Sequence, residues 1–176
     1  KDLSKNIRNN FNIKEGWLVV KHVFGIESPA PAMLLSILKA LGKRVNHEEI
    51  KALNDEECLA RIKTTLSKPK KGTDGVVRML DEMGKALDFQ SRQNKDLHIF
   101  QSLADIAQQA ESPVVIIGFL HQAFTEYAKN KDASTRKEWA KVQGRYRDLG
   151  YNPSIDESLV LVGESINIPN QTADKL

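Results

Sequence analysis

Cysteine, long apolar runs and metal-binding motifs are scarce in this sequence. The single cysteine, Cys58, cannot form an intramolecular disulfide, which excludes a disulfide-stapled scaffold and favours a reducing, cytoplasmic location. The longest apolar segment, PVVIIGFL at residues 113 to 120, is far shorter than the ~20 residues that span a bilayer. The four histidines have neither HExxH nor CxxC-type spacing. The sequence therefore predicts no membrane span, no metal site and no cofactor.

The charge balance is only mildly basic, with a net charge of +3 and a pI near 8.9, so it permits contact with nucleic acid without indicating it. In a chain of 176 residues, 40% hydrophobic and 28% charged residues are typical of one globular domain. The absence of an initiator Met leaves open a trimmed chain and a missing neighbouring domain. We predict a single domain over residues 1–176, with a basic helical insertion at about 121–155.

Apolar periodicity predicts several helices in the first half of the chain. From Ala32 the apolar positions cover most of a helix circumference until Gly42, and two prolines stand at the entrance of this helix. Asn46 is expected to cap the next helix, HEEIKAL, and Asp55 a third helix that ends near Leu66. The first half is therefore expected to be rich in helix.

The second half is expected to alternate between strands and helices. VVRMLDEMG, residues 76 to 84, predicts an amphipathic helix, whereas ALDFQSR, residues 86 to 92, alternates like a strand. A helix through Ala110 precedes PVVIIGFL, which is predicted to be a strand buried on both faces. Residues 121 to 149 predict one or two exposed helices, and residues 158 to 168 a final strand or hairpin, while residues 17 to 24 fit a strand or a helix. This order indicates an α+β domain.

Three sequence features that are often reactive carry no chemistry in this interpretation. GTDGVV lacks the Lys-Ser/Thr pair of a nucleotide cradle. Asp81 and Glu82 are adjacent, and adjacent side chains point in different directions on a helix and to opposite faces on a strand, so no acid/base pair is expected there. The carboxylates of Glu56 and Glu57 flank Cys58 and should raise its thiol pKa, which disfavours the nucleophilic thiolate.

The stretch SPAPAMLLSILKALGKRVNHEEI, residues 28 to 50, resembles the start of papain-like, bacteriocin-processing cysteine peptidase domains, which also precede some bacterial export ATPases. Its apolar helix, the turn KRV and the capped NHEEI stand at the spacing of that family. GTDGVVRMLDEMGKALDFQ, SPVVIIGF and ESLVLVGESINI are similar to later elements of the family. The resemblance covers about residues 28–119 and 155–168. It implies a papain-like arrangement, with the helix-rich first half packed on a small, mostly antiparallel sheet.

The catalytic positions of that family are not matched. Pro29-Ala30-Pro31 stands where the family has its nucleophile, Glu157 and Ser158 where it has its histidine, and only Asn167 could replace the orienting residue. Proline suits a first helical turn but cannot attack a carbonyl. The resemblance therefore implies a module that is not an enzyme and that binds a polypeptide partner or substrate in export. Its degenerate cleft would be lined by Pro29, Ala30, Pro31, Met33, Glu157, Ser158 and Asn167.

Two alternatives from other functional classes stay open. A basic accessory module of a nucleic-acid-handling system would engage phosphates and bases through scattered basic and aromatic side chains, although a solvated loop and a helix face with core-facing aromatics explain the same residues. The candidate contacts are Lys68, Lys70, Lys71, Arg136, Lys137, Trp139 and Arg145. An unrecognised hydrolase would instead use His121, near the end of the strand predicted at residues 113 to 120.

Overall fold

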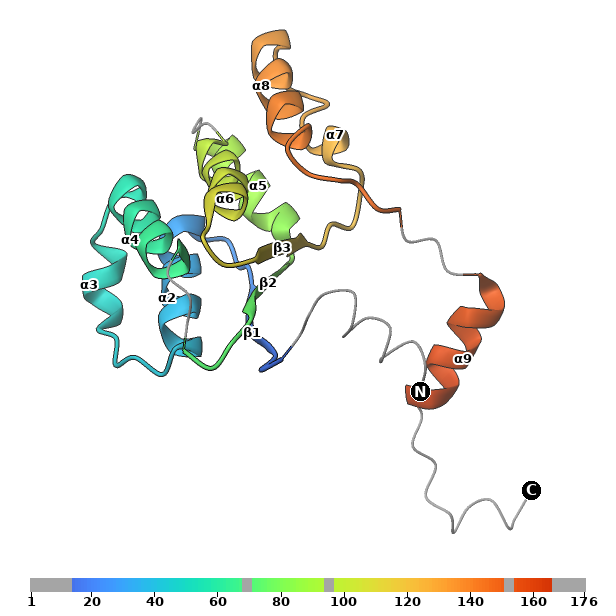
Figure 1. Ribbon diagram of the computed structural model, residues 1–176. Coiled ribbons are helices and arrows are strands. Elements are labelled where there is room, and N and C mark those ends of the chain that lie inside the picture. The colour runs from blue at the N-terminus through green and yellow to red at the C-terminus, as the bar shows by residue number, and fades with distance from the viewer. Residues whose placement is uncertain (1–13, 68–70, 94–96, 151–153, 166–176) are drawn as a thin grey trace, which may run out of the picture. The chain divides into compact units, whose positions relative to one another are not determined.

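The computed structural model describes residues 14–67, 71–93, 97–150 and 154–165, and the chain divides into two compact units, residues 1–146 and 147–176. The first unit contains a sheet of three parallel strands, β1 (Trp17–Val23), β2 (Gly75–Asp81) and β3 (Val114–Gly118), in the order β1-β2-β3 (Figure 1). In the second unit, the described helix is α9 (Ile155–Ser165). No described helix is both long and apolar enough to cross a membrane.

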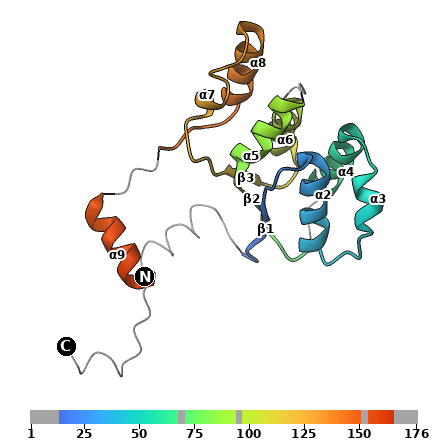
Figure 2. The same ribbon diagram turned by 180° about the vertical axis from the view of Figure 1, so that it is seen from behind.

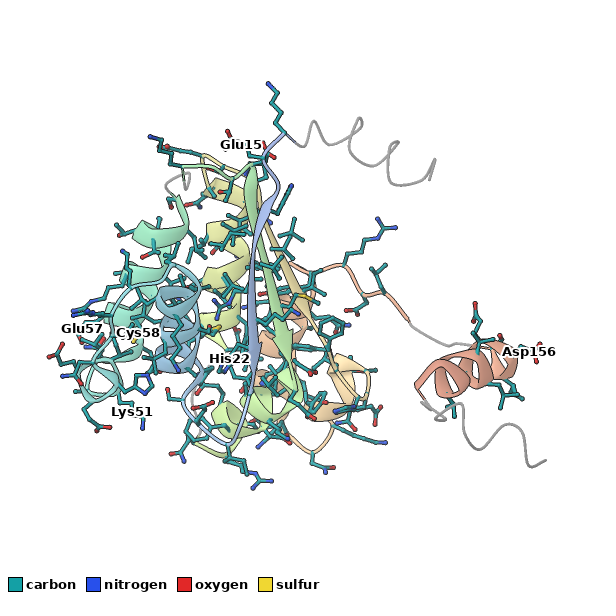
Figure 3. All side chains as sticks on the ribbon, turned by 90° about the horizontal axis from the view of Figure 1, so that it is seen from below. Glu15, His22, Lys51, Glu57, Cys58 and Asp156 are labelled. Carbon is teal, nitrogen blue, oxygen red and sulfur yellow. The ribbon has the colours of Figure 1, made fainter. Side chains whose placement is uncertain are left out.

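Helices connect the parallel strands. Between β1 and β2 the chain forms α2 (Pro29–Ala40), α3 (His47–Lys51) and α4 (Asp55–Ser67), and between β2 and β3 it forms α5 (Met83–Arg92) and α6 (His98–Gln109). The short α7 (Phe124–Tyr127) and α8 (Ala133–Gln143) follow β3. Right-handed crossovers in a sheet of order 1-2-3 place the connecting helices on one face. Accordingly α2 packs on β1, α6 on β3, and α4 against both helices (Figures 2 and 3).

The general prediction of an α+β domain is confirmed, but the predicted antiparallel sheet is wrong. All three strands run in the same direction, with Val19 beside Val77 and Val77 beside Val115. Parallel neighbours cannot be joined by hairpins and need long crossovers, which the five helices between the strands supply. The sheet therefore has the architecture of consecutive βαβ units.

Three element predictions fail, two of them beside the sheet and one in the second unit. VVRMLDEMG forms strand β2 and only the start of α5, and ALDFQSR lies inside the α5 helix rather than in a strand. The fully buried Arg78 interrupts the apolar pattern of β2, which made the strand read as an amphipathic helix. The strand or hairpin expected at 158 to 168 is helix α9 in its described part, where Ser154 and Glu157 form a capping box.

The helix entrances agree better with the sequence. Pro29 and Pro31 occupy the first turn of α2, and Gly42 follows the helix with φ +67°. The Asn46 side chain accepts a hydrogen bond from the Glu48 backbone N–H at the start of α3. The α4 helix begins at Asp55, but its cap is Asn54 rather than the predicted Asp55, because Asn54 Oδ1 accepts the Glu57 N–H at 2.8 Å.

The two faces of the sheet differ in burial. Val20, Leu80 and Val114 point towards the helices and are buried in the core. The other face is exposed, so the prediction that β3 is buried on both faces is wrong. We call this other side the open face; it comprises Val19, Lys21, Val23, Val77, Met79, Val115 and Ile117.

Candidate functional site

The carboxyl ends of the three strands meet at one edge of the sheet, where open parallel sheets bind their ligands. The backbone holds this edge together beyond the strands. Phe24 donates its N–H to the Asp81 carbonyl at 3.0 Å, and Phe119 donates to the Leu80 carbonyl at 2.9 Å. Met83 in turn donates to the Phe119 carbonyl at 3.2 Å. The turn after the central strand is therefore fixed by its neighbours on both sides.

Two carboxylates occupy this turn. Asp81 ends β2 with an exposed side chain, and its Oδ1 accepts the Glu82 N–H at 2.8 Å. Glu82 has φ 54° and ψ 33°, and within the described residues it is the one non-glycine position with positive φ. A left-handed conformation costs a non-glycine residue about 1–3 kcal/mol and persists only where its surroundings enforce it. The backbone thus turns sharply between the two carboxylates, directly after the strand.

The Glu82 carboxylate faces two basic side chains. His121 Nε2, from the segment after β3, lies 3.1 Å from Glu82 Oε2, and Lys85 Nζ lies 3.5 Å from the same oxygen. The Glu82 side chain is 26% exposed, whereas that of His121 is 75% exposed. A half-buried carboxylate, an exposed carboxylate and an accessible imidazole therefore share one edge. We call Asp81, Glu82, Lys85 and His121 the strand-end cluster.

The strand-end cluster does not form a complete metal cage. Within the described ranges, no group of three or more His, Cys, Asp or Glu side chains is arranged to hold a metal ion. Mg²⁺ does not need such a cage, because it keeps several waters and binds through one or two carboxylates and the phosphates of a substrate. The adjacent Asp81 and Glu82 carboxylates fit that requirement.

A second histidine lies near the same edge, at the end of β1. His22 Nε2 is 3.6 Å from Glu27 Oε1, and its ring meets that of Phe24 edge-on with centroids 4.6 Å apart. Burial lowers the pKa of His22 below its usual value, partly offset by the Glu27 carboxylate. His22 (Figure 3) is therefore neutral at pH 7, and its contacts are those of a packed side chain.

The residues predicted to line a degenerate peptidase cleft do not gather around an open cleft in the first unit. Pro29, Ala30, Pro31 and Met33 are buried in α2. Pro31 also touches a shallow pocket lined by Ser28, Lys51, Leu53, Asn54, Asp55 and Glu56. Glu157 and Ser158 belong to α9, where both bond to Ser154, and Asn167 lies outside the described residues.

The predicted basic and aromatic contacts are dispersed. Trp139 is buried against Phe124, with ring centroids 5.4 Å apart, so it cannot stack on a base. Arg145 forms an ion pair with Asp105. Lys71, Arg136 and Lys137 are exposed, and Lys68 and Lys70 lie outside the described residues. The core-facing interpretation of Trp139 is therefore confirmed.

Cys58 lies inside the helical layer, fully buried in α4 (Figure 3). Burial, with a further contribution from Asp55, raises the pKa of its thiol to about 11. The predicted direction of this shift is right, but burial is a larger cause than the neighbouring glutamates. We therefore expect no thiol chemistry at Cys58.

No protein-family model, curated protein or solved structure matches this chain. The function is therefore inferred from the arrangement of the residues in the fold. The sequence pattern singled out His121, whereas Asp81 and Glu82 were not expected to form an acid/base pair, because neighbouring side chains diverge on a helix and point to opposite faces on a strand. The signal that could have found them is an apolar run that ends in two acidic residues, which is typical of a strand leading into a site.

Proposed function

We propose that the first unit binds a nucleoside triphosphate as its Mg²⁺ complex at the strand-end cluster and hydrolyses it. The observation that carries this proposal is the position of Asp81 and Glu82 at the carboxyl end of the central parallel strand, with His121 beside them. Open α/β sheets bind ligands at this edge, and nucleoside triphosphatases hold Mg²⁺ with an acidic residue of this kind. The alternative hypothesis of a hydrolase that uses His121 thus acquires two further candidate residues, Asp81 and Glu82.

Three members of the cluster have distinct roles in this mechanism. The exposed Asp81 carboxylate binds the waters of the Mg²⁺ ion that accompanies the phosphates. The half-buried Glu82 accepts a proton from the water that attacks the terminal phosphorus, and the bond from that phosphorus to the leaving diphosphate oxygen breaks. His121 orients the Glu82 carboxylate and, when protonated, faces the negative phosphate.

The group that cradles the phosphates must come from elsewhere. GTDGVV cannot supply it, because residues 72 to 77 lie at the amino end of β2, at the opposite edge of the sheet. Nucleotide affinity of this chain is therefore expected to depend strongly on Mg²⁺ and the carboxylates.

The test measures binding of a fluorescent ATP analogue with and without Mg²⁺, together with phosphate release. Asp81→Asn should weaken Mg²⁺-dependent binding by at least ~10-fold, because the Mg²⁺ waters lose their anionic partner. Glu82→Gln should keep binding but reduce hydrolysis by ~100- to 10,000-fold. Glu48→Gln, an exposed carboxylate on α3, is the matched control and should change neither. An affinity for the ATP analogue that changes neither with Mg²⁺ nor with Asp81→Asn would contradict the proposal.

A second candidate function, binding of a polypeptide partner, is favoured by the open face. Parallel sheets are ordinarily covered by helices on both sides, yet Val19, Val115 and Ile117 are 39–47% exposed here. A partner that covers this face would remove these side chains from water. Hydrogen exchange tests this function, because the amides of β3 should exchange more slowly when such a partner is bound. The inactive peptidase-like cleft and the phosphate contacts of the basic residues stay predictions.

A further inference from the structure

Met83, the first residue of α5, packs against the end of β3. Its side chain is buried, and a Cβ placed on Gly118, the last residue of β3, would overlap Met83 Sδ and lie 3.7 Å from Met83 Cε. The missing side chain of Gly118 therefore makes room for the thioether. The Met83 N–H also donates to the Phe119 carbonyl at 3.2 Å. The side chain and the backbone of Met83 thus contact two successive residues at the end of β3.

These contacts act on both partners of the ion pair in the strand-end cluster. Glu82 immediately precedes Met83 and has the left-handed conformation, with φ 54°. Asp81, which ends β2, fixes the amino side of Glu82, and Met83 fixes its carboxyl side. A strained conformation persists only where its surroundings enforce it in this way. On the neighbouring strand, Phe119 lies two residues before His121, so a shift of the thioether would move Glu82 relative to the segment that carries His121.

We propose that Met83 is a positioning residue whose side chain, seated on Gly118, keeps the Glu82 carboxylate in contact with the His121 imidazole. Its role in catalysis rests on the proposed function, but its role in the geometry does not. Because the His121 side chain is largely exposed, little packing restrains it, and its 3.1 Å contact with Glu82 depends on where the two backbones lie. Two groups held in this way lose little further freedom when a substrate binds.

The test records the NMR signals of the His121 ring in the whole chain. Glu82→Gln should shift these signals in the parent, because the carboxylate lies 3.1 Å from the ring. In a Gly118→Ala background the same substitution should cause a shift at least ~2-fold smaller, because the added methyl group displaces Met83 Sδ in a closely packed site. The amide signals of β3 show whether each variant is folded.

Further variants separate the role of Met83 from that of Gly118. Met83→Ala alone should reduce the response of His121 to Glu82→Gln, because the thioether no longer anchors the turn. Adding Gly118→Ala to Met83→Ala should reduce the response no further, since the atom that the methyl group displaces is gone.

Gly25→Ala is the matched control for Gly118→Ala. Gly25 lies two residues after β1, and the atom nearest to its added Cβ is Glu27 Oε1 at 3.8 Å, an ordinary contact. This variant should leave the response of the His121 ring unchanged.

The outcomes separate this inference from the proposed function. A parent-like response in Gly118→Ala or Met83→Ala, or an effect of Gly118→Ala that persists undiminished in the Met83→Ala background, would overturn the positioning role, whatever the hydrolytic activity. Reduced responses in a chain that neither binds nor hydrolyses Mg²⁺·ATP would support the positioning role and refute the proposed function. If both hold, Gly118→Ala should lower kcat by ~10-fold with little change in KM, since it alters the orientation of the base rather than substrate binding.

Discussion

Arg78 Nη2 donates a hydrogen bond to Ser36 Oγ at 3.2 Å, which joins the centre of β2 to α2 in the middle of the core. The Arg78 side chain is fully buried, and its Nε and Nη1 have no hydrogen-bond partner within the described part of the chain. Burial lowers the pKa of Arg78 to about 9, so the guanidinium is still charged at neutral pH. A buried charge with one neutral partner destabilises a fold.

Replacing this charge should therefore stabilise the first unit. Arg78→Met keeps a long, unbranched side chain and is expected to raise the free energy of unfolding by about 1–4 kcal/mol in urea titrations. Ser36→Ala removes this acceptor, together with the hydrogen bond that the hydroxyl donates to the Met33 carbonyl, and should lower the free energy of unfolding by about 1–3 kcal/mol. If Arg78→Met is instead clearly destabilising, an anionic group compensates the guanidinium in solution.

Cys58 should react only when the chain unfolds. With its pKa raised to about 11 and its sulfur buried, the native thiol is expected to react with iodoacetamide at pH 8 at least ~100-fold more slowly than in urea. Mass spectrometry of the modified peptide over time gives both rates. Comparable rates in the two conditions would show that α4 does not pack as described.

Asp74 should make stability depend on pH. Its Oδ2 accepts the backbone N–H groups of Lys14, Glu15 and Gly16 at 2.7–2.8 Å, and these bonds lower the pKa of its carboxyl. A lowered folded-state pKa adds stability that is present above the unfolded pKa of ~3.9 and is lost as the pH falls through the lower folded value. Asp74→Asn should therefore destabilise the protein at pH 7, and the difference should shrink below about pH 4.

The control for Asp74 is Glu56→Gln, an exposed carboxylate on α4. It should leave the melting temperature unchanged at pH 7. A constant difference between parent and Asp74→Asn from pH 7 to pH 2.5 would mean that the carboxylate charge contributes nothing.

The two faces of β3 should respond differently to mutation. Val114→Ala removes core contacts and is expected to cost about 1.5–3 kcal/mol of stability. Ile117→Thr keeps a β-branched side chain on the open face and should cost no more than about 0.5 kcal/mol while lowering the binding of a hydrophobic dye. Equal costs for the two variants would indicate that something already covers the open face.

Local signals in the sequence were sufficient for several elements. Asn46 and the prolines of α2 act through their own backbone neighbours, so capping rules located these helix starts. The β-branched run of β3 likewise predicted a strand. The direction of the strands depends on pairing between distant segments, which no local pattern encodes.

The candidate site was predictable only in part, for the same reason. His121 stood out because it follows a strand that was recognised. Asp81 and Glu82 were set aside because neighbouring side chains diverge on a helix and on a strand alike, and neither pattern predicts the left-handed turn at Glu82. Glu82 begins the crossover from β2 to β3, whereas His121 follows β3, and the parallel pairing of these two strands brings the two residues together.

The parallel order of the sheet also sets the sequence of events in folding. The contact of Asp74 with Gly16 joins positions 58 residues apart, and the β1–β2 ladder begins next to it. Such closures cost chain entropy before any strand pair forms, whereas α2 and α4 need only local contacts. We expect the helical layer to gather first, and the central strand to enter last on a timescale of ~milliseconds to seconds. During synthesis on a ribosome, both edges of β1 would then stay unpaired until β2 has emerged.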